Sequence, residues 1–325
     1  MTPRIKLLLL VCASPLLLFG CVLLGASGIG LPDLENHLGR AILTLRINRV
    51  AGGFVVGAAL ACAGVVFQAL LRNPLAEPYI LGVSSGAGLG ATLCILAGVT
   101  VASVFLLPVT AFMAAALTLV VVFMLASDRG AFPSVYSLIL SGVIVSAICS
   151  SILMFIVAMA PVEGLHSVIW WMLGNLQPSA RELLVICAAI IVAGCSIAWL
   201  IAPELNALTL GRETAHNIGV RTTAIVIVGL GTATLMTGAA VGLSGLIGFV
   251  GLIVPHVMRN LFGPNHRTLI PAAALGGGVF LSVCDAAART VMPGVEIPVG
   301  VVTALCGGPF FLVILRRRNR RTFAA

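Results

Sequence analysis

The stretch VAGGFVVGAALACAGVVFQALL, residues 50–71, decides the class of fold. It contains no Asp, Glu, Lys or Arg, and a helix of about 20 apolar residues is long enough to cross a bilayer. Because a charged side chain in lipid is costly, uncharged stretches mark the candidate membrane spans. This stretch therefore predicts a transmembrane helix.

Seven further uncharged runs lie on either side of this stretch. Two of them are long enough for two helices each: residues 78–127, with a break near 98–104, and residues 222–258, with a break near 242–245. The others cover residues 7–32, 130–162, 183–203, 268–284 and 297–315. We therefore expect an all-α polytopic membrane protein with about ten transmembrane helices, folded as a single transmembrane domain over residues 1–325.

The composition supports the same class. Sixty per cent of the residues are apolar and 9% are charged, whereas an average soluble domain is about 25% charged. A soluble protein of this composition would lack the polar groups to cover its surface. The composition excludes a soluble enzyme, a disordered chain and a nucleic-acid-binding module.

The basic residues predict the orientation of the spans. Cytoplasmic loops of membrane proteins carry an excess of Lys and Arg. With both termini inside, 13 of the 18 basic residues fall on the cytoplasmic side, among them Arg4, Lys6 and the arginines between positions 316 and 321. We therefore expect both termini in the cytoplasm, and the net charge of +8 reflects this asymmetry rather than a nucleic-acid partner.

Two loops carry a pattern of their own. The inner loop ELNALTLGRETAHNIGVR, residues 204–221, predicts two short amphipathic helices joined by glycine. Such a loop suits docking of a soluble partner, although a merely structured loop fits the same pattern. The outer loop, residues 161–182, contains the pair Trp170-Trp171. Paired Trp is typical of a helix at the headgroup level, and a plain aromatic anchor is the alternative.

Three smaller features concern helix packing. The turn RNPLAEP, residues 72–78, contains two prolines that keep its backbone out of a helix. Glycines at 82, 86 and 90 follow on one helical face, a spacing that permits close approach of a neighbouring helix. Asp285, the candidate acid inside an apolar stretch, precedes Arg289 by four residues, which predicts an ion pair near the outer membrane face.

The sequence contains no GxxxxGK[ST] phosphate loop and no HExxH zinc motif, so we expect neither ATP hydrolysis by this chain nor a metal or cofactor site. Two other classes of protein stay open. An ion-coupled secondary transporter would need buried carboxylates or broken helices around an ion site, for which Asp285 is thin support. An intramembrane hydrolase or transferase would use Ser and His, but His256 has no acid near it in the sequence.

Three stretches resemble the permease subunits of iron-chelate, haem and cobalamin ABC importers, the FecCD type. The first runs from Arg46 to Ala87 and includes RINR (46–49), QALLRNPLAEP (68–78) and LGVSSGA (81–87). The second is GLIGFVGLIVPHVMR (245–259), and the third is EIPVGVVTA (296–304) with GGP at 307–309. The similarity extends from about residue 40 to the C-terminus. It implies the type II ABC-importer permease architecture, whose ten helices agree with the runs above.

The resemblance also implies the partners and the location. Two copies of the chain would form a homodimer with the translocation path at their interface. A dimer of a separate ABC ATPase would bind underneath, and a periplasmic or extracellular substrate-binding protein would dock on the outer face. The chain would cross the bacterial cytoplasmic (inner) membrane several times, surrounded by membrane lipid, and would carry out no covalent chemistry.

The resemblance assigns residues to two docking sites. The loop 204–221 looks like the family's coupling loop, and the expected ATPase-coupling residues are Leu208, Leu210, Gly211, Arg212 and Gly219. Arg46, Arg49 and Arg289 match arginines that pair with glutamates of the binding protein. Their charge suits an acidic docking face, and a simple interfacial anchor is the alternative.

The fifth span resembles the helix that lines the family's path, with the inner gate near the loop before it. The expected path and gate residues are Pro133, Ser134, Ser137, Ser141, Ser146 and Ser150. Serine is equally useful for packing between membrane helices, so a packing role stays open.

The cargo is not decided by these residues. No paired His, Cys or Tyr lines the predicted path, which fits a weakly interacting channel whose specificity resides in the binding protein. We expect an iron chelate such as a ferric siderophore, because that is the broadest class in the family. Cobalamin is the first alternative and haem the second.

Overall fold

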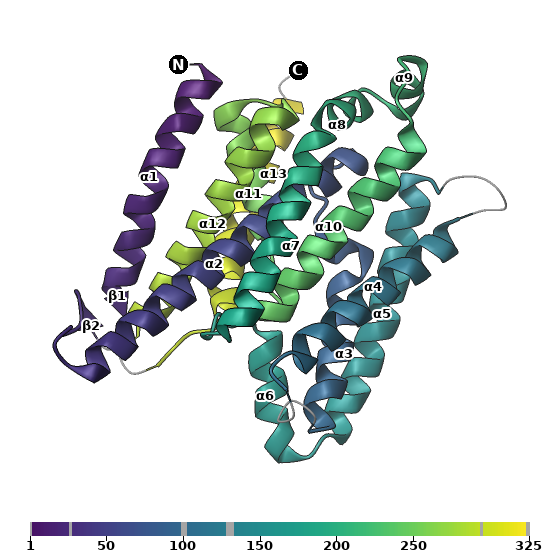
Figure 1. Cartoon of the computed structure of the whole chain (residues 1–325). Coiled ribbons are helices and arrows are strands. Elements are labelled where there is room, and N and C mark those ends of the chain that lie inside the picture. Colours follow the sequence, from purple (N-terminus) through teal and green to yellow (C-terminus); the bar gives the residue numbers. More distant parts are fainter. Residues whose placement is uncertain (1, 26–27, 99–102, 128–132, 293–294, 323–325) are drawn as a thin grey trace.

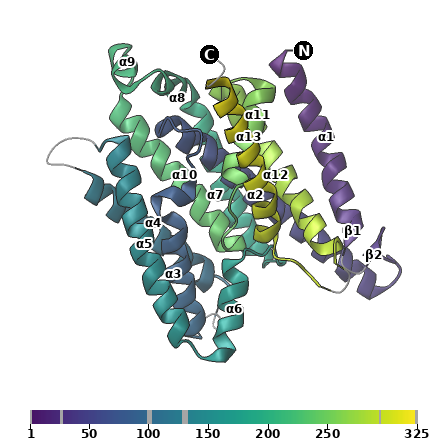
Figure 2. The ribbon, with the colours of Figure 1, turned by 180° about the vertical axis from the view of Figure 1, so that it is seen from behind.

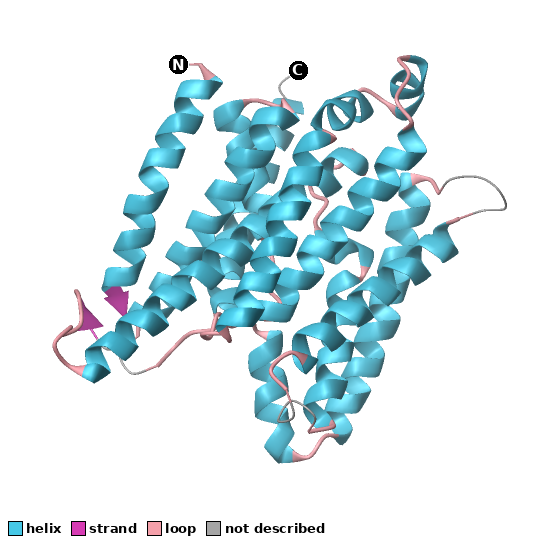
Figure 3. Cartoon of the chain, viewed as in Figure 1, coloured by secondary structure: helices cyan, strands magenta, loops and turns pink. Residues whose placement is uncertain are grey.

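The computed structural model describes residues 2–25, 28–98, 103–127, 133–292 and 295–322, and most of them are helical (Figure 3). The helices are α1 (Pro3–Leu23), α2 (His37–Leu70), α3 (Val83–Leu96), α4 (Leu106–Ala126), α5 (Val135–Met159), α6 (Val162–Met172), α7 (Arg181–Leu200), α8 (Ala202–Thr209), α9 (Arg212–Asn217), α10 (Thr222–Ser244), α11 (Val250–Phe262), α12 (His266–Thr290) and α13 (Val299–Thr322). A short 3-10 helix, η1 (Pro78–Leu81), precedes α3. Two short antiparallel strands, β1 (Leu24–Gly25) and β2 (Gly28–Ile29), follow α1.

The long helices confirm the predicted all-α membrane architecture. Among the described residues, seven helices are long and apolar enough to cross a membrane: α1, α2, α4, α5, α7, α10 and α12. Three shorter apolar helices, α3, α11 and the part of α13 up to Ile314, account for the remaining predicted spans. Ten membrane crossings and cytoplasmic termini stay predictions.

The helices form one bundle with two distinct ends (Figures 1 and 2). The start of α1, the end of α13 and the short helices α8 and α9 lie at one end, which we call the inner end. Helix α6 and the two strands lie at the opposite end, which we call the outer end. Helix α1 lies at one edge of the bundle, and α4 and α5 lie at the other.

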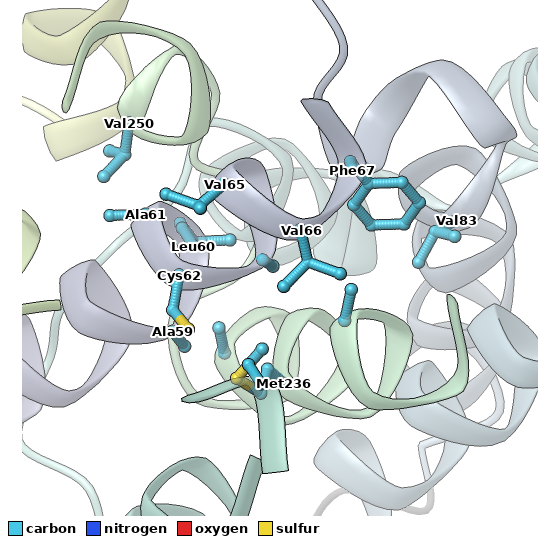
Figure 4. Close-up of a cluster of buried hydrophobic side chains, with 14 of the residues drawn as sticks. Ala59, Leu60, Ala61, Cys62, Val65, Val66, Phe67, Val83, Met236 and Val250 are labelled. Carbon is cyan, nitrogen blue, oxygen red and sulfur yellow. The ribbon is translucent and has the colours of Figure 1, made fainter. Parts of the chain in front are cut away.

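Helix α2 lies at the centre of the bundle and packs against α10, α11 and α12. Its side chains Val65, Val66 and Phe67 are fully buried in the hydrophobic core, to which Met236 of α10 also belongs (Figure 4). The helices approach closely where glycines face each other. A Cβ atom on Gly57 would collide with the backbone of Gly277 in α12, and one on Gly64 would collide with that of Gly251 in α11. The small residues at these crossings let the helix backbones approach closely, which larger side chains would prevent.

The glycine face of α3 behaves as its spacing predicts. A Cβ atom on Gly86 would collide with Thr118 of α4, and one on Gly90 would lie against the backbone of Thr110. The break between α10 and α11 falls at residues 245–249, slightly later than the predicted 242–245. Gly245 and Phe249 both adopt positive φ there, at 67° and 69°, so the chain reverses over these few residues.

Two predicted span boundaries are wrong, and both errors involve charge. Helix α2 begins at His37, well before the uncharged run at 50–71, and α12 continues to Thr290, beyond the run at 268–284. The additional turns contain Arg46, Arg49 and Arg289, all of which are buried. Charged residues ended the predicted runs because an unpaired charge is costly in lipid, but these arginines are bonded inside the chain.

Candidate functional sites at the two ends of the bundle

The predicted pair of short helices is present at the inner end. Helices α8 and α9 are separated by Leu210 and Gly211, and the chain turns again at Gly219 before α10. Gly211 has φ 127° and Gly219 has φ 91°, values that side chains with a Cβ atom rarely adopt. The glycines that marked this loop in the sequence therefore form its two turns.

The predicted coupling residues fall into two groups by burial. Leu208 is buried in the bundle core, whereas the side chain of Leu210 is 71% exposed. Arg212 is half-buried at the start of α9, and its Nη2 donates to Thr223 Oγ1 at 3.3 Å. The buried Leu208 attaches α8 to the bundle core, whereas Leu210 is an uncovered apolar side chain at the inner end.

A polar clamp that the sequence did not predict fixes α8 to α12. The carboxamide oxygen of Asn206 accepts from the backbone N–H of His266 at 3.0 Å and lies 2.6 Å from its Nδ1. The Asn206 amide donates to Asn265 Oδ1 at 3.1 Å. Helix α8 is therefore held at the first turn of α12. Its partners lie about 60 residues further along the chain, so no local pattern revealed this clamp.

A cavity of about 320 Å³ brings the predicted coupling and gate residues together. Leu208 and Arg212 line it from the coupling helices, and Pro133 and Ser134 line it from the start of α5. Ser134 caps α5, since its Oγ accepts from the backbone N–H of Ser137 at 3.0 Å. The rest of the loop before Pro133, residues 128–132, lies outside the described residues.

The other predicted path residues follow α5 away from this cavity. Ser137, Ser141 and Ser146 are half-buried and Ser150 is exposed. Few side chains of α5 are buried against the rest of the chain. The helix therefore has a large free face, but lining of a path by these serines stays a prediction.

At the outer end, Arg49, Asp285 and Arg289 form a buried charge cluster. Arg49 Nε and Arg289 Nε each lie 3.0 Å from a carboxylate oxygen of Asp285, so the predicted Asp285–Arg289 ion pair is confirmed. Arg49 Nη1 also lies 2.9 Å from Glu296 Oε2. The Asp285 side chain is 1% exposed and that of Glu296 is 40% exposed. One buried carboxylate is therefore shared by two guanidinium groups, and Glu296 at the rim supplies the second negative charge.

Arg46 binds backbone carbonyls at the end of α1. Its Nη1 donates to the carbonyl of Gly30 at 2.8 Å and to that of Leu23 at 3.3 Å, and its Nη2 donates to that of Gly28 at 3.0 Å. The last carbonyls of a helix have no partner within it and favour a nearby cation. Arg46, Arg49 and Arg289 are thus all buried and bonded inside the chain, and their predicted docking role stays a prediction.

A cavity of about 980 Å³ opens at the outer end. Its lining includes His166 and Trp170 of α6, Trp171, Ser244 and Glu296. The Trp170 indole N–H donates to His166 Nε2 at 2.6 Å, and Trp171 packs on the hydrophobic core. The paired Trp residues therefore line a cavity in addition to any contact with the membrane surface. No role was predicted from the sequence for His166 or Glu296.

The proline-containing turn holds two further polar groups against the α10–α11 connection. The Tyr79 hydroxyl donates to the carbonyl of Ile247 at 2.6 Å and accepts from its N–H at 3.0 Å. Glu77, in the turn before η1, has its pKa raised to about 7 by burial, although the backbone N–H of Phe249 partly opposes this shift. Residues 77–79 and residues 245–249 are therefore joined by polar contacts.

Comparison with known proteins places this chain among transport proteins. Residues 7–317 match the model of the FecCD transport family. The cobalamin import system permease protein BtuC of Halobacterium salinarum is 40% identical over 294 residues, covering 90% of this chain and 77% of that protein. The hemin transport system permease protein HmuU of Yersinia pestis is 35% identical, covering 98% of each chain.

A solved structure shows the same architecture. It is described as an inward-facing conformation of a metal-chelate type ABC transporter, and it is 30% identical to this chain. It superimposes with a TM-score of 0.88, covering 97% of this chain and 99% of that one. The likeness extends over the whole bundle, including both ends described above.

Proposed function

This chain belongs to the FecCD transport family, and from that premise we propose how it works as the permease subunit of an ABC importer for iron chelates, haem or cobalamin. The observation that carries the mechanism is the inner cavity shared by Leu208 and Arg212 with Pro133 and Ser134. Across this cavity the two coupling helices face the start of α5.

At the inner end, the partner ATPase binds the exposed side of α8 and α9. Leu210 supplies an uncovered apolar side chain, and the glycine turns at 211 and 219 set the direction of α9. Asn206 holds α8 to α12, so a displacement of α8 is passed into the bundle rather than absorbed by the loop. The displacement reaches the gate at Pro133 and Ser134 through the cavity that they share with Leu208.

The path lies between two copies of the chain, with α5 at the interface of a homodimer. The free face of α5 and its hydroxyl groups at Ser137, Ser141, Ser146 and Ser150 support this placement. Short hydroxyl side chains allow two helices to approach closely and offer only weak contacts to a passing cargo. With an added thiol oxidant such as copper phenanthroline, Ser150→Cys should form a disulfide between two copies if this arrangement is correct.

A substrate-binding protein docks at the outer end, where Arg46, Arg49 and Arg289 lie. Arg49 is the best placed of the three, because its partner Glu296 is partly exposed beside the outer cavity. A carboxylate of the binding protein would exchange with Glu296 for the Arg49 guanidinium. Docking of this kind would replace the Arg49–Glu296 ion pair within the chain by an ion pair between Arg49 and the binding protein.

We propose that the cargo is an iron chelate. The chain itself is placed in the bacterial cytoplasmic membrane. The likeness to a metal-chelate type transporter over nearly the whole length of both chains supports this class. Cobalamin is the second candidate, because the cobalamin permease of Halobacterium salinarum is 40% identical to this chain.

Uptake into proteoliposomes tests the proposal. The vesicles would hold this chain, its partner ATPase and internal ATP, with the partner binding protein outside, and labelled ferric siderophore and labelled cobalamin would be offered separately. We expect uptake of the siderophore that stops when ATP is replaced by a non-hydrolysable analogue. ATP-dependent uptake of cobalamin alone would move the cargo to the second candidate, and uptake driven by an ion gradient without ATP would contradict the mechanism.

A further inference from the structure

An apolar groove of about 560 Å³ lies between α2, α7 and α12, away from both sites described above. Its lining is apolar apart from Ser196, and it includes Phe54, Ile191, Trp199 and Ala274. Its volume is in the range of ligand sites, which span about 300–1,000 Å³. Along α7 the lining extends from Ala188 to Leu200, about 18 Å at 1.5 Å per residue.

The α7 side of this groove lies on the outside of the bundle. Val192, Trp199 and Leu200 are 65%, 48% and 67% exposed. In a chain that spans a membrane, such side chains face the hydrocarbon. The length of the groove corresponds to one leaflet, because half of a hydrocarbon core of about 30 Å is about 15 Å.

The inner end of the groove has a defined geometry around Pro271. A proline has no N–H, so Pro271 leaves the carbonyl of Arg267, four residues earlier, without its helical partner. The Trp199 indole N–H donates to this carbonyl at 3.1 Å. Trp199 is thereby held at the inner end of the groove, with its N–H directed toward the first turn of α12.

The charge at this point belongs to Arg267. Arg267, Pro271 and Ala274 follow one another at i, i+4 and i+7, so they share the face of α12 that lines the groove. The Arg267 side chain is exposed, and among the described residues its guanidinium makes no hydrogen bond or ion pair. The groove therefore ends, at the inner surface, beside the Trp199 indole and a cation that has no partner within the described part of the chain.

We propose that this groove is a binding site for an anionic phospholipid of the inner leaflet. One acyl chain lies along α7 between α2 and α12, and the phosphate is bound by the Arg267 guanidinium. An apolar slot that ends in a cation at the headgroup level matches the chemistry of such a lipid, and basic pockets between membrane helices bind anionic headgroups in this way. The site is independent of the cargo and of the coupling mechanism.

Quenching of Trp199 by brominated lipid tests this site. Trp170→Phe with Trp171→Phe leaves Trp199 as the single Trp of the chain. The protein would be reconstituted in phosphatidylcholine and titrated with phosphatidylglycerol or phosphatidylcholine carrying brominated acyl chains. We expect half-maximal quenching at an about fivefold lower mole fraction of brominated phosphatidylglycerol, which is the preference that one arginine supplies near a membrane surface.

Two variants separate this site from general lipid contact. Arg267→Gln should remove the preference for phosphatidylglycerol, whereas Arg221→Gln, which removes an exposed arginine at the inner end outside the groove, should keep it. Ala274→Phe, which fills the groove, should reduce quenching by both lipids. Equal quenching by the two lipids in the starting protein, a preference that survives Arg267→Gln, or the absence of quenching by either lipid would overturn the proposal.

Discussion

Two groups of arginines, one at each end of the bundle, differ in how they are bonded. At the outer end Arg46, Arg49 and Arg289 are buried, and each is bonded to a carboxylate or to backbone carbonyls of the same chain. At the inner end Arg221 and Arg267 are exposed. The outer arginines consequently contribute to the fold, and Arg49 can pair with a docking partner only by exchanging its bond to Glu296. The two inner arginines are available to a partner or to the membrane surface without such an exchange.

The buried charges of the outer cluster also contrast with two uncovered apolar side chains at the inner end. Leu210 and Ile218, which directly follow α8 and α9, are more than 60% exposed. A buried ion pair has to be complete, because removing one partner leaves an uncompensated charge. An exposed apolar side chain on a short helix contributes little to folding and is suited to an interface. The comparison therefore predicts that changes to the buried outer charges act on stability, and that changes to the exposed inner side chains act on coupling.

The largest effect is expected from Asp285→Ala. The substitution leaves Arg49 and Arg289 buried without the carboxylate that they share, so the free energy of unfolding should fall by about 3–5 kcal/mol. Thermal denaturation in detergent would measure it. Glu296→Gln is the matched control: its side chain is partly exposed, and the loss should stay below about 1 kcal/mol. Similar losses for both variants would contradict the description of the outer cluster.

Leucines 208 and 210 allow a test at the inner end with the same substitution. Leu208→Ala removes a core side chain and should cost about 2–5 kcal/mol of unfolding free energy. Leu210→Ala should change stability by less than about 0.5 kcal/mol but weaken binding of the partner ATPase about tenfold, as expected for an interface residue of moderate importance. Unchanged ATPase affinity in Leu210→Ala would remove this residue from the interface.

Asn206→Ala should separate the fastening of α8 from its docking. The variant loses the hydrogen bonds to Asn265 and His266, an effect of about 1–3 kcal/mol for a clamp of this kind. We expect ATP hydrolysis by the assembled transporter to continue while uptake per ATP decreases. If uptake per ATP stays at the wild-type value, α8 does not need its attachment to α12.

The smallest effect concerns pH. In the folded chain burial raises the pKa of Glu77 to about 7 from its ordinary value of 4.5, so the folded state retains this proton to higher pH than the unfolded chain. Stability should therefore decrease as the pH rises from about 4.5 to 7 and then level off. Glu77→Gln should make the thermal midpoint less dependent on pH in this range, and an identical dependence in both proteins would contradict the assignment.

Much of the fold follows from apolar runs and glycines. The uncharged stretches located the apolar helices, and the glycines at 211 and 219 marked the turns that frame α9. The helix boundaries were predicted wrongly at α2 and α12, because a charge was taken to end a span. That rule fails here because Asp285 and Glu296 together balance the charges of Arg49 and Arg289 within the chain.

The residues that the sequence did not reveal have distant partners. Glu296 contacts Arg49 across 247 positions, Tyr79 contacts Ile247 across 168, and Asn206 contacts His266 across 60. No period or spacing along one helix encodes such pairs, which depend on how the helices pack. The burial of the predicted docking arginines was missed for the same reason.

Gly211→Pro gives the most direct test of the central claim, that α8 and α9 pass the action of the ATPase to the gate. A proline cannot adopt φ 127°, and it removes the N–H that donates to the carbonyl of Leu208. ATP hydrolysis and uptake would be measured in the same proteoliposomes. We predict that the variant folds and hydrolyses ATP but takes up less than about a tenth of the wild-type cargo per ATP, which corresponds to at least 1.4 kcal/mol. Normal uptake driven by ATP would contradict the assignment of this loop to coupling.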